Sequence, residues 1–298
     1  MAIPETQLET WAKQGSVTQS RTTYDTIKNA LESNNTGYAW KDFGVFLQGS
    51  YGNDTNIWSE SDVDVIIRLN STFQYDISSL PDAQKDAFNI AHAGNASYTY
   101  GTFKDDVAKH LKSRFGEDVQ PGKKAIKVKA NGSRRNADVV VAIEFRRYQS
   151  FFSLTNQSYL SGICFYTPSW DKIINYPKQH SDNCTTKHQA TKSYFKPMVR
   201  ILKNARVKLV NDGKIDSPGV APSYFLEGLM YNVPNSLFAG SYQDAMVAAV
   251  NWIVAQDRSK FVTANEQFYL LGNSAVAWEA AKCDAFLSSF INLWKNWS

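Results

Sequence analysis

The fold is decided by the stretch Phe46–Ile67, which reads FLQGSYGNDTNIWSESDVDVII in the 298-residue chain. It predicts an apolar strand that leads into Gly49-Ser50, a polar loop, and a second strand that carries Asp62 and Asp64. Because side chains alternate along a strand, both carboxylates are expected on one face. Two acids side by side on an apolar strand repel each other and are costly to desolvate, and divalent cations remove that cost. Hard oxygen ligands suit Mg²⁺, so the stretch predicts a magnesium site.

A third acid is expected from a neighbouring strand. Two metal ions about 3.5–4 Å apart can clamp the attacking and leaving oxygens of a phosphoryl transfer, and such a pair usually needs a third carboxylate. Asp138 is the candidate, because it is a lone acid at the start of an apolar run. Glu144, at the far end of the same predicted strand, is the alternative.

The Gly49-Ser50 turn offers groups that bind phosphate. Glycine lets a phosphate approach the main chain, and exposed N–H groups together with the Ser50 hydroxyl can cradle a triphosphate. Taken singly, paired strand acids are typical of exposed sheet edges, and Gly-Ser is typical of ordinary turns. Their order, with Asp62 twelve positions after Ser50 and a lone strand acid later, favours the functional interpretation.

Composition sets broad limits on the class of protein. The chain is 43% hydrophobic and 20% charged, which excludes a disordered, collagen-like or membrane-spanning chain. The net charge of +4 permits a local site for an anionic ligand but is too small for a protein that coats nucleic acid. We therefore expect no nucleic-acid binding and no membrane association.

Cysteine usage and the first residues predict a cytoplasmic protein. The three cysteines form no CxxC pair and no disulfide framework. The first residues lack the basic and apolar regions of a secretory signal.

The chain is expected to divide into two parts near residue 150, an α+β part (1–150) and a mostly helical part (151–298). The first part begins with helical sequence up to residue 33, and 81–115 is helical with interruptions at Gly94 and Gly101. Strands are expected at 43–47, 63–69, 123–130 and 137–145, the last two flanking the hairpin signal Asn131-Gly132. A loop-rich stretch is expected at 153–186, followed by helices at about 190–211, 221–231, 243–255 and 275–294.

These motifs resemble the nucleotidyltransferase superfamily of DNA polymerase beta, whose signature is Gly-Ser, a spacer and then alternating acids. More closely, the chain resembles the bacterial CD-NTases, the cyclic GMP-AMP synthase-like enzymes of anti-phage signalling. The resemblance lies in blocks that run in family order, namely Gln48–Ile57, Ser61–Asp64, Asn175–His180, Lys196–Asn204 and Pro222–Glu227. It implies a polymerase-beta-like lobe with a mixed sheet, an N-terminal spine helix, and a C-terminal helical lobe that closes the active-site cleft.

The resemblance also implies a function. It implies condensation of NTPs into a cyclic dinucleotide second messenger, dependent on two Mg²⁺ ions for which Mn²⁺ can substitute. Asp62 and Asp64 would hold both metal ions, and Asp138 would complete the site and help to activate the ribose hydroxyl. It further implies a downstream effector that binds the product, and we expect the enzyme to be a monomer.

The resemblance implies three further positions that would contact the nucleotide. Lys203, on a predicted basic helix face, would contact the triphosphate; the alternative is a solvated face. Ser223 would bind phosphate and Tyr224 would stack on the base; the alternatives are a helix cap and a core tyrosine.

Asn175 is the candidate specificity residue. One branch of the family prefers pyrimidine nucleotides, and an amide can pair with the O4 and N3–H of uracil. At least one pyrimidine substrate is therefore expected, and the alternative is a turn asparagine before Pro177.

Other interpretations compete with these. His180, Cys184 and His188 have a spacing that suggests zinc, but they lack a fourth ligand, and loop residues are the better interpretation. A template-independent transferase acting on an RNA, tRNA or protein acceptor shares the acids but would need a broad basic groove. A nucleotide-sensing protein with a dead site would be expected to have lost at least one of the acids.

Overall fold

The computed structural model describes residues 2–59, 62–94, 96–274 and 276–297. Ser61 of the quoted motif and Ala275, where the last helix was expected to begin, lie outside the described residues. The chain forms two compact units. The helical unit comprises Met1–Thr18, Gln48–Ser61 and Lys178–Ser298, and the sheet unit comprises Gln19–Leu47 and Asp62–Pro177. The predicted division at residue 150 stays a prediction.

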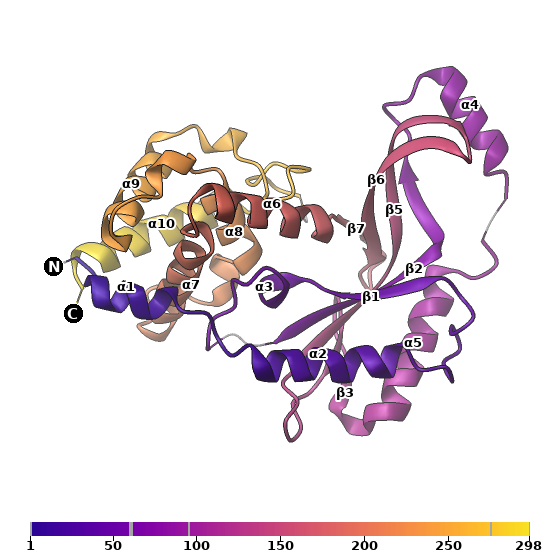
Figure 1. Cartoon of the computed structure of the whole chain (residues 1–298), viewed down its shortest axis with the longest axis horizontal. Helices are drawn as coiled ribbons and strands as arrows, with labels where there is room; N and C mark the ends of the chain where they lie inside the picture. The colour runs from indigo at the N-terminus through magenta and orange to yellow at the C-terminus, as the bar shows by residue number, and fades with distance from the viewer. Residues whose placement is uncertain (1, 60–61, 95, 275, 298) are drawn as a thin grey trace. The chain divides into compact units, whose positions relative to one another are not determined.

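The sheet unit is built on a mixed sheet (Figure 1). Within the described residues its strands are β1 (Phe43–Leu47), β2 (Val63–Asp76), β3 (Val119–Pro121), β4 (Ile126–Val128), β5 (Ala137–Ser153), β6 (Asn156–Tyr166) and β7 (Lys172–Asn175). The strand order is β1-β2-β5-β4-β3, and β6 pairs with β5 and β7. Only the β2–β5 pair is parallel among these strands.

The centre of the sheet is apolar on both faces. Val63, Val65 and Ile66 of β2 are fully buried, as are Val139 and Ala142 of β5. Runs of β-branched residues favour strands, and burial on both faces explains why these runs are continuous rather than alternating. The two central strands therefore form a rigid base for whatever side chains stand at their ends.

Two helices lie side by side against this sheet, α2 (Thr18–Leu31) and α5 (Tyr100–Phe115) (Figure 1). Phe103, Val107 and Leu111 recur at helical spacing on α5, and all are fully buried. The helix begins after Thr99, whose side chain accepts a hydrogen bond from Thr102 N–H, as expected of an N-cap residue. A further helix, α4 (Asp82–Ala91), packs Phe88 against the long outer part of β5.

The helical unit contains α1 (Glu5–Ala12), α3 (Gly49–Gly52), α6 (Pro177–Ala190), α7 (Phe195–Asn211), α8 (Ser223–Tyr231), α9 (Tyr242–Ala255) and α10 (Ala280–Lys295). Its core is large and apolar, and α7 contributes residues on most of its faces. The Glu5 carboxylate of α1 accepts the N–H groups of Tyr242 (2.7 Å) and Gln243 (2.9 Å) at the start of α9. A carboxylate in that position also compensates the helix dipole.

Two sequence expectations are corrected by these elements. The expected interruption of a helix at Gly101 is wrong, because Gly101 lies within α5. The prediction of a loop-rich stretch at 153–186 is wrong, because this stretch contains β6, β7 and most of α6. β6 begins with Asn156, Gln157 and Ser158, polar residues that pair with β5 outside the main core. α6 lacks an apolar stripe, because its buried residues are His180 and Cys184.

Most of the other element predictions are confirmed. The residues Asn131-Gly132 form the predicted hairpin turn. Two backbone hydrogen bonds between Asn131 and Arg134 close it, and Gly132 has φ +59°. The four predicted C-terminal helices correspond to α7, α8, α9 and α10, with starts displaced by one to five residues. None of the helices in the described part of the chain is long and apolar enough to cross a membrane.

Candidate active site

The three predicted acids gather at one end of the central strand pair of the sheet unit. β2 and β5 run parallel with Asp64 directly opposite Asp138, both half-buried. Asp62 is exposed and lies one residue before β2 begins. Since Asp62 and Asp64 are two residues apart, alternation directs them to the same face. The structure therefore brings together the three acids that the sequence singled out.

The electrostatics of this edge couple Asp138 to two neighbouring charged residues. Burial raises the pKa of Asp138, the positive charge of Lys127 lowers it, and the negative charge of Asp62 raises it again. Lys127 lies opposite Asp138 in the antiparallel β4–β5 register. Sequence analysis missed Lys127, and only the strand register reveals it.

The donor set fits Mg²⁺. It consists of carboxylate oxygens on adjacent strands, with no histidine or cysteine among them. Hard divalent cations prefer such ligands, and they relieve the repulsion between neighbouring carboxylates.

The alternative acid, Glu144, has other partners. It lies six residues further along β5, which is roughly 20 Å at the usual rise of a strand. Its carboxylate accepts hydrogen bonds from Arg146 (2.7 Å) and from the Ser161 hydroxyl (2.9 Å). Glu144 therefore belongs to a structural ion pair.

The Gly49-Ser50 turn lies in the helical unit. Gly49 has φ +67°, in the left-handed region that favours glycine, and it begins the short helix α3. Ser50 O accepts the N–H of Thr55 (2.8 Å), and Gly49 O accepts the N–H of Asn53 (3.1 Å). The turn is thus closed on itself by main-chain hydrogen bonds.

Cations of α7 hold the segment that follows this turn. Lys196 binds the Asp54 carboxylate (2.9 Å), Arg200 donates to Asp54 O (2.6 Å), and Lys203 donates to Thr55 O (2.9 Å). All three are buried, and Lys203 is fully so. The alternative interpretation of Lys203 as part of a solvated helix face is wrong, because this face packs on the segment after the turn. Its contact with a triphosphate stays a prediction.

Glu227 of α8 is a buried acid of this unit that the sequence did not single out as a functional residue. It accepts hydrogen bonds from Asn53 Nδ2 (3.1 Å), from His180 Nε2 (2.6 Å) and from the Thr55 hydroxyl. Burial alone would raise its pKa, but the hydrogen bond and charge of His180, the charge of Lys203 and the Thr55 hydroxyl together lower it. Glu227 is therefore an ionised, hydrogen-bonded centre beneath the turn.

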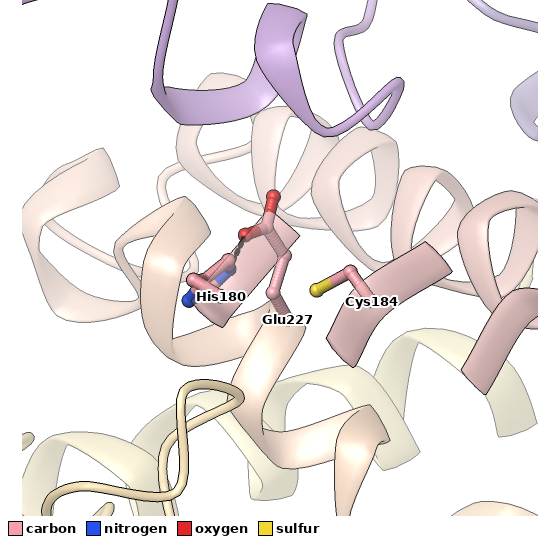
Figure 2. A group of neighbouring side chains, drawn as sticks. All are labelled: His180, Cys184 and Glu227. Carbon is pink, nitrogen blue, oxygen red and sulfur yellow. Dashed lines mark hydrogen bonds and ion pairs between the residues drawn. The ribbon is translucent and has the colours of Figure 1, made fainter. Parts of the chain in front are cut away.

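Figure 2 shows Glu227 with His180 and Cys184, whose potential ligand atoms lie within 4.8 Å of one another. The expectation that His180, Cys184 and His188 are loop residues is wrong, since all three lie on α6, where His180 and Cys184 are buried. The donor set does not fit zinc well. Both carboxylate oxygens of Glu227 already accept hydrogen bonds, and burial raises the pKa of the Cys184 thiol well above its usual value. His188 is outside this group.

Ser223 and Tyr224 begin α8. The N-cap residue is Pro222, so the alternative of Ser223 as the helix cap is wrong, and its hydroxyl accepts a bond from Arg206 (3.4 Å). The Tyr224 ring stacks on His180 with ring centroids 4.9 Å apart, and its hydroxyl accepts a bond from Asn265 (2.9 Å). Burial raises the pKa of Tyr224 to about 12. Tyr224 is half-buried.

Asn175 ends β7 in the sheet unit. Its Oδ1 accepts the N–H of the next residue, Tyr176 (2.8 Å). Gly162 of β6 makes room for it, because a Cβ at that position would lie 2.7 Å from Asn175 O. The structure therefore holds Asn175 at a tightly packed strand end.

Comparison with known proteins decides the family. A family model for the cGAS/DncV-like nucleotidyltransferase C-terminal helical domain matches residues 182–295. The cyclic UMP-AMP synthase of Rhodothermus marinus is 39% identical over 301 residues, covering 100% of this chain and 99% of that protein. The chain belongs to the CD-NTase family of cyclic nucleotide synthases.

One further relative of this CD-NTase and one solved structure agree. The cyclic dipyrimidine nucleotide synthase CdnE of Legionella pneumophila is 35% identical, with 93% of each chain covered. A solved structure of Rhodothermus marinus CdnE c-UMP-AMP synthase with Apcpp and Upnpp matches with a TM-score of 0.87 at 37% identity, covering 99% of this chain and 98% of that one. The predicted family, the α+β fold with a C-terminal helical domain, and nucleotidyltransferase activity are confirmed.

Proposed function

We propose that this CD-NTase joins two NTPs, at least one of them a pyrimidine nucleotide, into a cyclic dinucleotide in a magnesium-dependent reaction. The identity of 39% along the whole chain to a cyclic UMP-AMP synthase carries the proposal. Cyclic UMP-AMP is therefore the first product to test for.

Asp62, Asp64 and Asp138 would hold the metal ions. The register of Asp64 with Asp138 and the charge coupling of Asp62 to Asp138 support this assignment. When bound, Mg²⁺ supplies charge neutralisation at the triphosphate and makes the ribose hydroxyl easier to deprotonate.

Beyond holding the metal ions, the protein contributes to catalysis by positioning the two nucleotides. The Gly49 main chain and the hydroxyls of Ser50 and Ser223 would contact the triphosphate, with Lys203 adding positive charge. Tyr224 would stack on a base, and Asn175 would select uracil through its amide.

Each condensation forms one bond and breaks one. The ribose hydroxyl oxygen of one nucleotide bonds to the α-phosphorus of the other, and the bond from that phosphorus to the bridging oxygen of the β-phosphate breaks. Pyrophosphate leaves, and Asp138 assists removal of the hydroxyl proton. A second such step closes the ring.

The biological setting is also part of the proposal. The family resemblance supports bacterial anti-phage signalling, in which a downstream effector binds the product. The enzyme would act in the cytoplasm, because its NTP substrates are found there and its three cysteines are free thiols. It would act as a monomer.

The test is incubation with all four radiolabelled NTPs and either Mg²⁺ or Mn²⁺, followed by phosphatase. A phosphatase-resistant product that requires UTP, and that is absent with the Asp62→Asn/Asp64→Asn protein, supports the proposal. Label found only on added RNA would show that the enzyme is a transferase to an acceptor instead. Base choice is tested with Asn175→Ser, since a preference identical to the wild type would remove Asn175 from the specificity site.

A further inference from the structure

Asp62 differs from the other two acids in how it is held. Asp64 and Asp138 stand in paired strands, where the ladder of β2 and β5 sets their positions. Asp62 precedes β2 and its side chain is exposed. Neither strand pairing nor packing therefore fixes its carboxylate, although a metal site requires all its ligands to be oriented.

Asn136, the residue before β5, supplies the missing contact. Its Nδ2 donates to Asp62 Oδ1 at 3.2 Å. Its main-chain oxygen accepts the N–H of Val63 at 3.0 Å. Asn136 thus holds the start of β2 by both its main chain and its side chain.

A further hydrogen bond fixes the orientation of the Asn136 amide. The N–H of Ala130 donates to Asn136 Oδ1 at 2.9 Å. Rotating the amide by 180° would place the NH₂ against that N–H, and the oxygen against the Asp62 carboxylate. Only the observed orientation satisfies both neighbours, so the amide must present a donor to Asp62.

We propose that Asn136 is a positioning residue that orients the Asp62 carboxylate for the metal ion. This inference rests on the proposed function, in which Asp62 is a metal ligand. The hydrogen bond engages Oδ1 and leaves Oδ2 without a protein partner among the described residues. Loss of an outer partner of this kind typically weakens metal binding or activity about 10–100-fold.

The test measures Mn²⁺ binding directly, by electron paramagnetic resonance of free Mn²⁺ in the presence of an NTP. Two variants remove the amide, Asn136→Ala and the nearly isosteric Asn136→Leu, which keeps the volume if the alanine variant unfolds. The matched control is Asn131→Ala, which removes an exposed asparagine of the same hairpin whose amide donates to Asp118. Circular dichroism and the thermal unfolding midpoint establish that each variant is folded.

We expect both Asn136 variants to bind Mn²⁺ about 10–100-fold more weakly, with turnover recovering at saturating Mn²⁺, and Asn131→Ala to match the wild type. Wild-type Mn²⁺ affinity in a folded Asn136 variant would overturn the inference and leave the proposed function intact. Loss of activity that Mn²⁺ does not restore, with a lowered unfolding midpoint in both variants, would show a structural role and also overturn it. If wild-type protein binds no Mn²⁺ that depends on Asp62 and Asp64, the proposed function itself fails.

Discussion

Two groups of side chains hold carboxylates in opposite environments. The acid edge of the sheet unit consists of Asp62, Asp64 and Asp138, and the Glu227 network of the helical unit consists of Glu227 with Asn53, Thr55 and His180. At the acid edge, Asp62 and Asp64 stand exposed or half-buried beside another acid. In the network, Glu227 is fully buried and surrounded by donors. The first arrangement costs stability until a cation binds, whereas the second stabilises the fold without any ligand. The same chemical group therefore serves binding in one unit and architecture in the other.

The largest expected effect is on activity at the acid edge. Asp62→Asn together with Asp64→Asn should lower turnover by at least about 10³-fold, because losing a single preorganised electrostatic contact already costs 10²–10³-fold. The unfolding midpoint should stay level or rise, since repulsion between carboxylates is relieved. Turnover is measured from labelled NTPs, and unfolding by differential scanning fluorimetry. A large fall in the midpoint would mean that these acids support the fold.

The Glu227 network should show the reverse pattern. Glu227→Ala removes the partner of buried cationic groups, so the free energy of unfolding should fall by about 3–5 kcal/mol. Urea denaturation measures this change. The control is Glu279→Ala, whose exposed pair with Lys282 should contribute under about 1 kcal/mol. Equal losses in the two variants would contradict the assignment of Glu227 as a structural centre.

A change in pH is expected to have a smaller effect on the free energy of unfolding. Because the folded pKa of Glu227 lies below its usual value of 4.5, its ionised form stabilises the fold above pH 4.5. That contribution should be lost as the pH falls through the folded pKa. The difference in unfolding free energy between the wild type and Glu227→Gln should therefore shrink below pH 4.5. A constant difference from pH 7 to pH 3 would show that the carboxylate charge is not responsible.

The smallest effects are expected at Tyr224, which packs within the helical unit and is also proposed to bind the nucleotide. Tyr224→Phe keeps the ring but loses the bond from Asn265, so stability should fall by about 1 kcal/mol with NTP affinity unchanged. Tyr224→Leu should in addition weaken NTP binding by about 1–3 kcal/mol if the ring stacks on a base. Isothermal titration calorimetry with a non-hydrolysable NTP measures the NTP affinity of each variant, and urea denaturation measures its stability. Unchanged affinity in Tyr224→Leu would make Tyr224 purely a packing residue.

The acid edge could be predicted from sequence because each of its acids is marked by a pattern of a few neighbouring residues. Alternation places Asp62 and Asp64 on one face, and an apolar run with a single acid identifies Asp138. The Glu227 network could not be predicted, because it joins residues far apart in sequence, such as Thr55 and Glu227. The segment that the cations of α7 bind could not be predicted for the same reason, since helical spacing reveals a face of a helix but not what covers it. Likewise, β6 and α6 were missed because their apolar signal is weak.

The interleaving of the two units also bears on the order of events during synthesis. The sheet unit is complete in sequence once Pro177 has been made, whereas the helical unit needs its first segment, Met1–Thr18, and its last, Lys178–Ser298. Domains tend to fold as units while the chain emerges from the ribosome. The acid edge can therefore form early in translation. Helix α1 has a place to dock only after α7 of the last segment has been made, because Arg200 donates to Ala12 O and Asn204 donates to Trp11 O; the contact of Glu5 with the start of α9 follows.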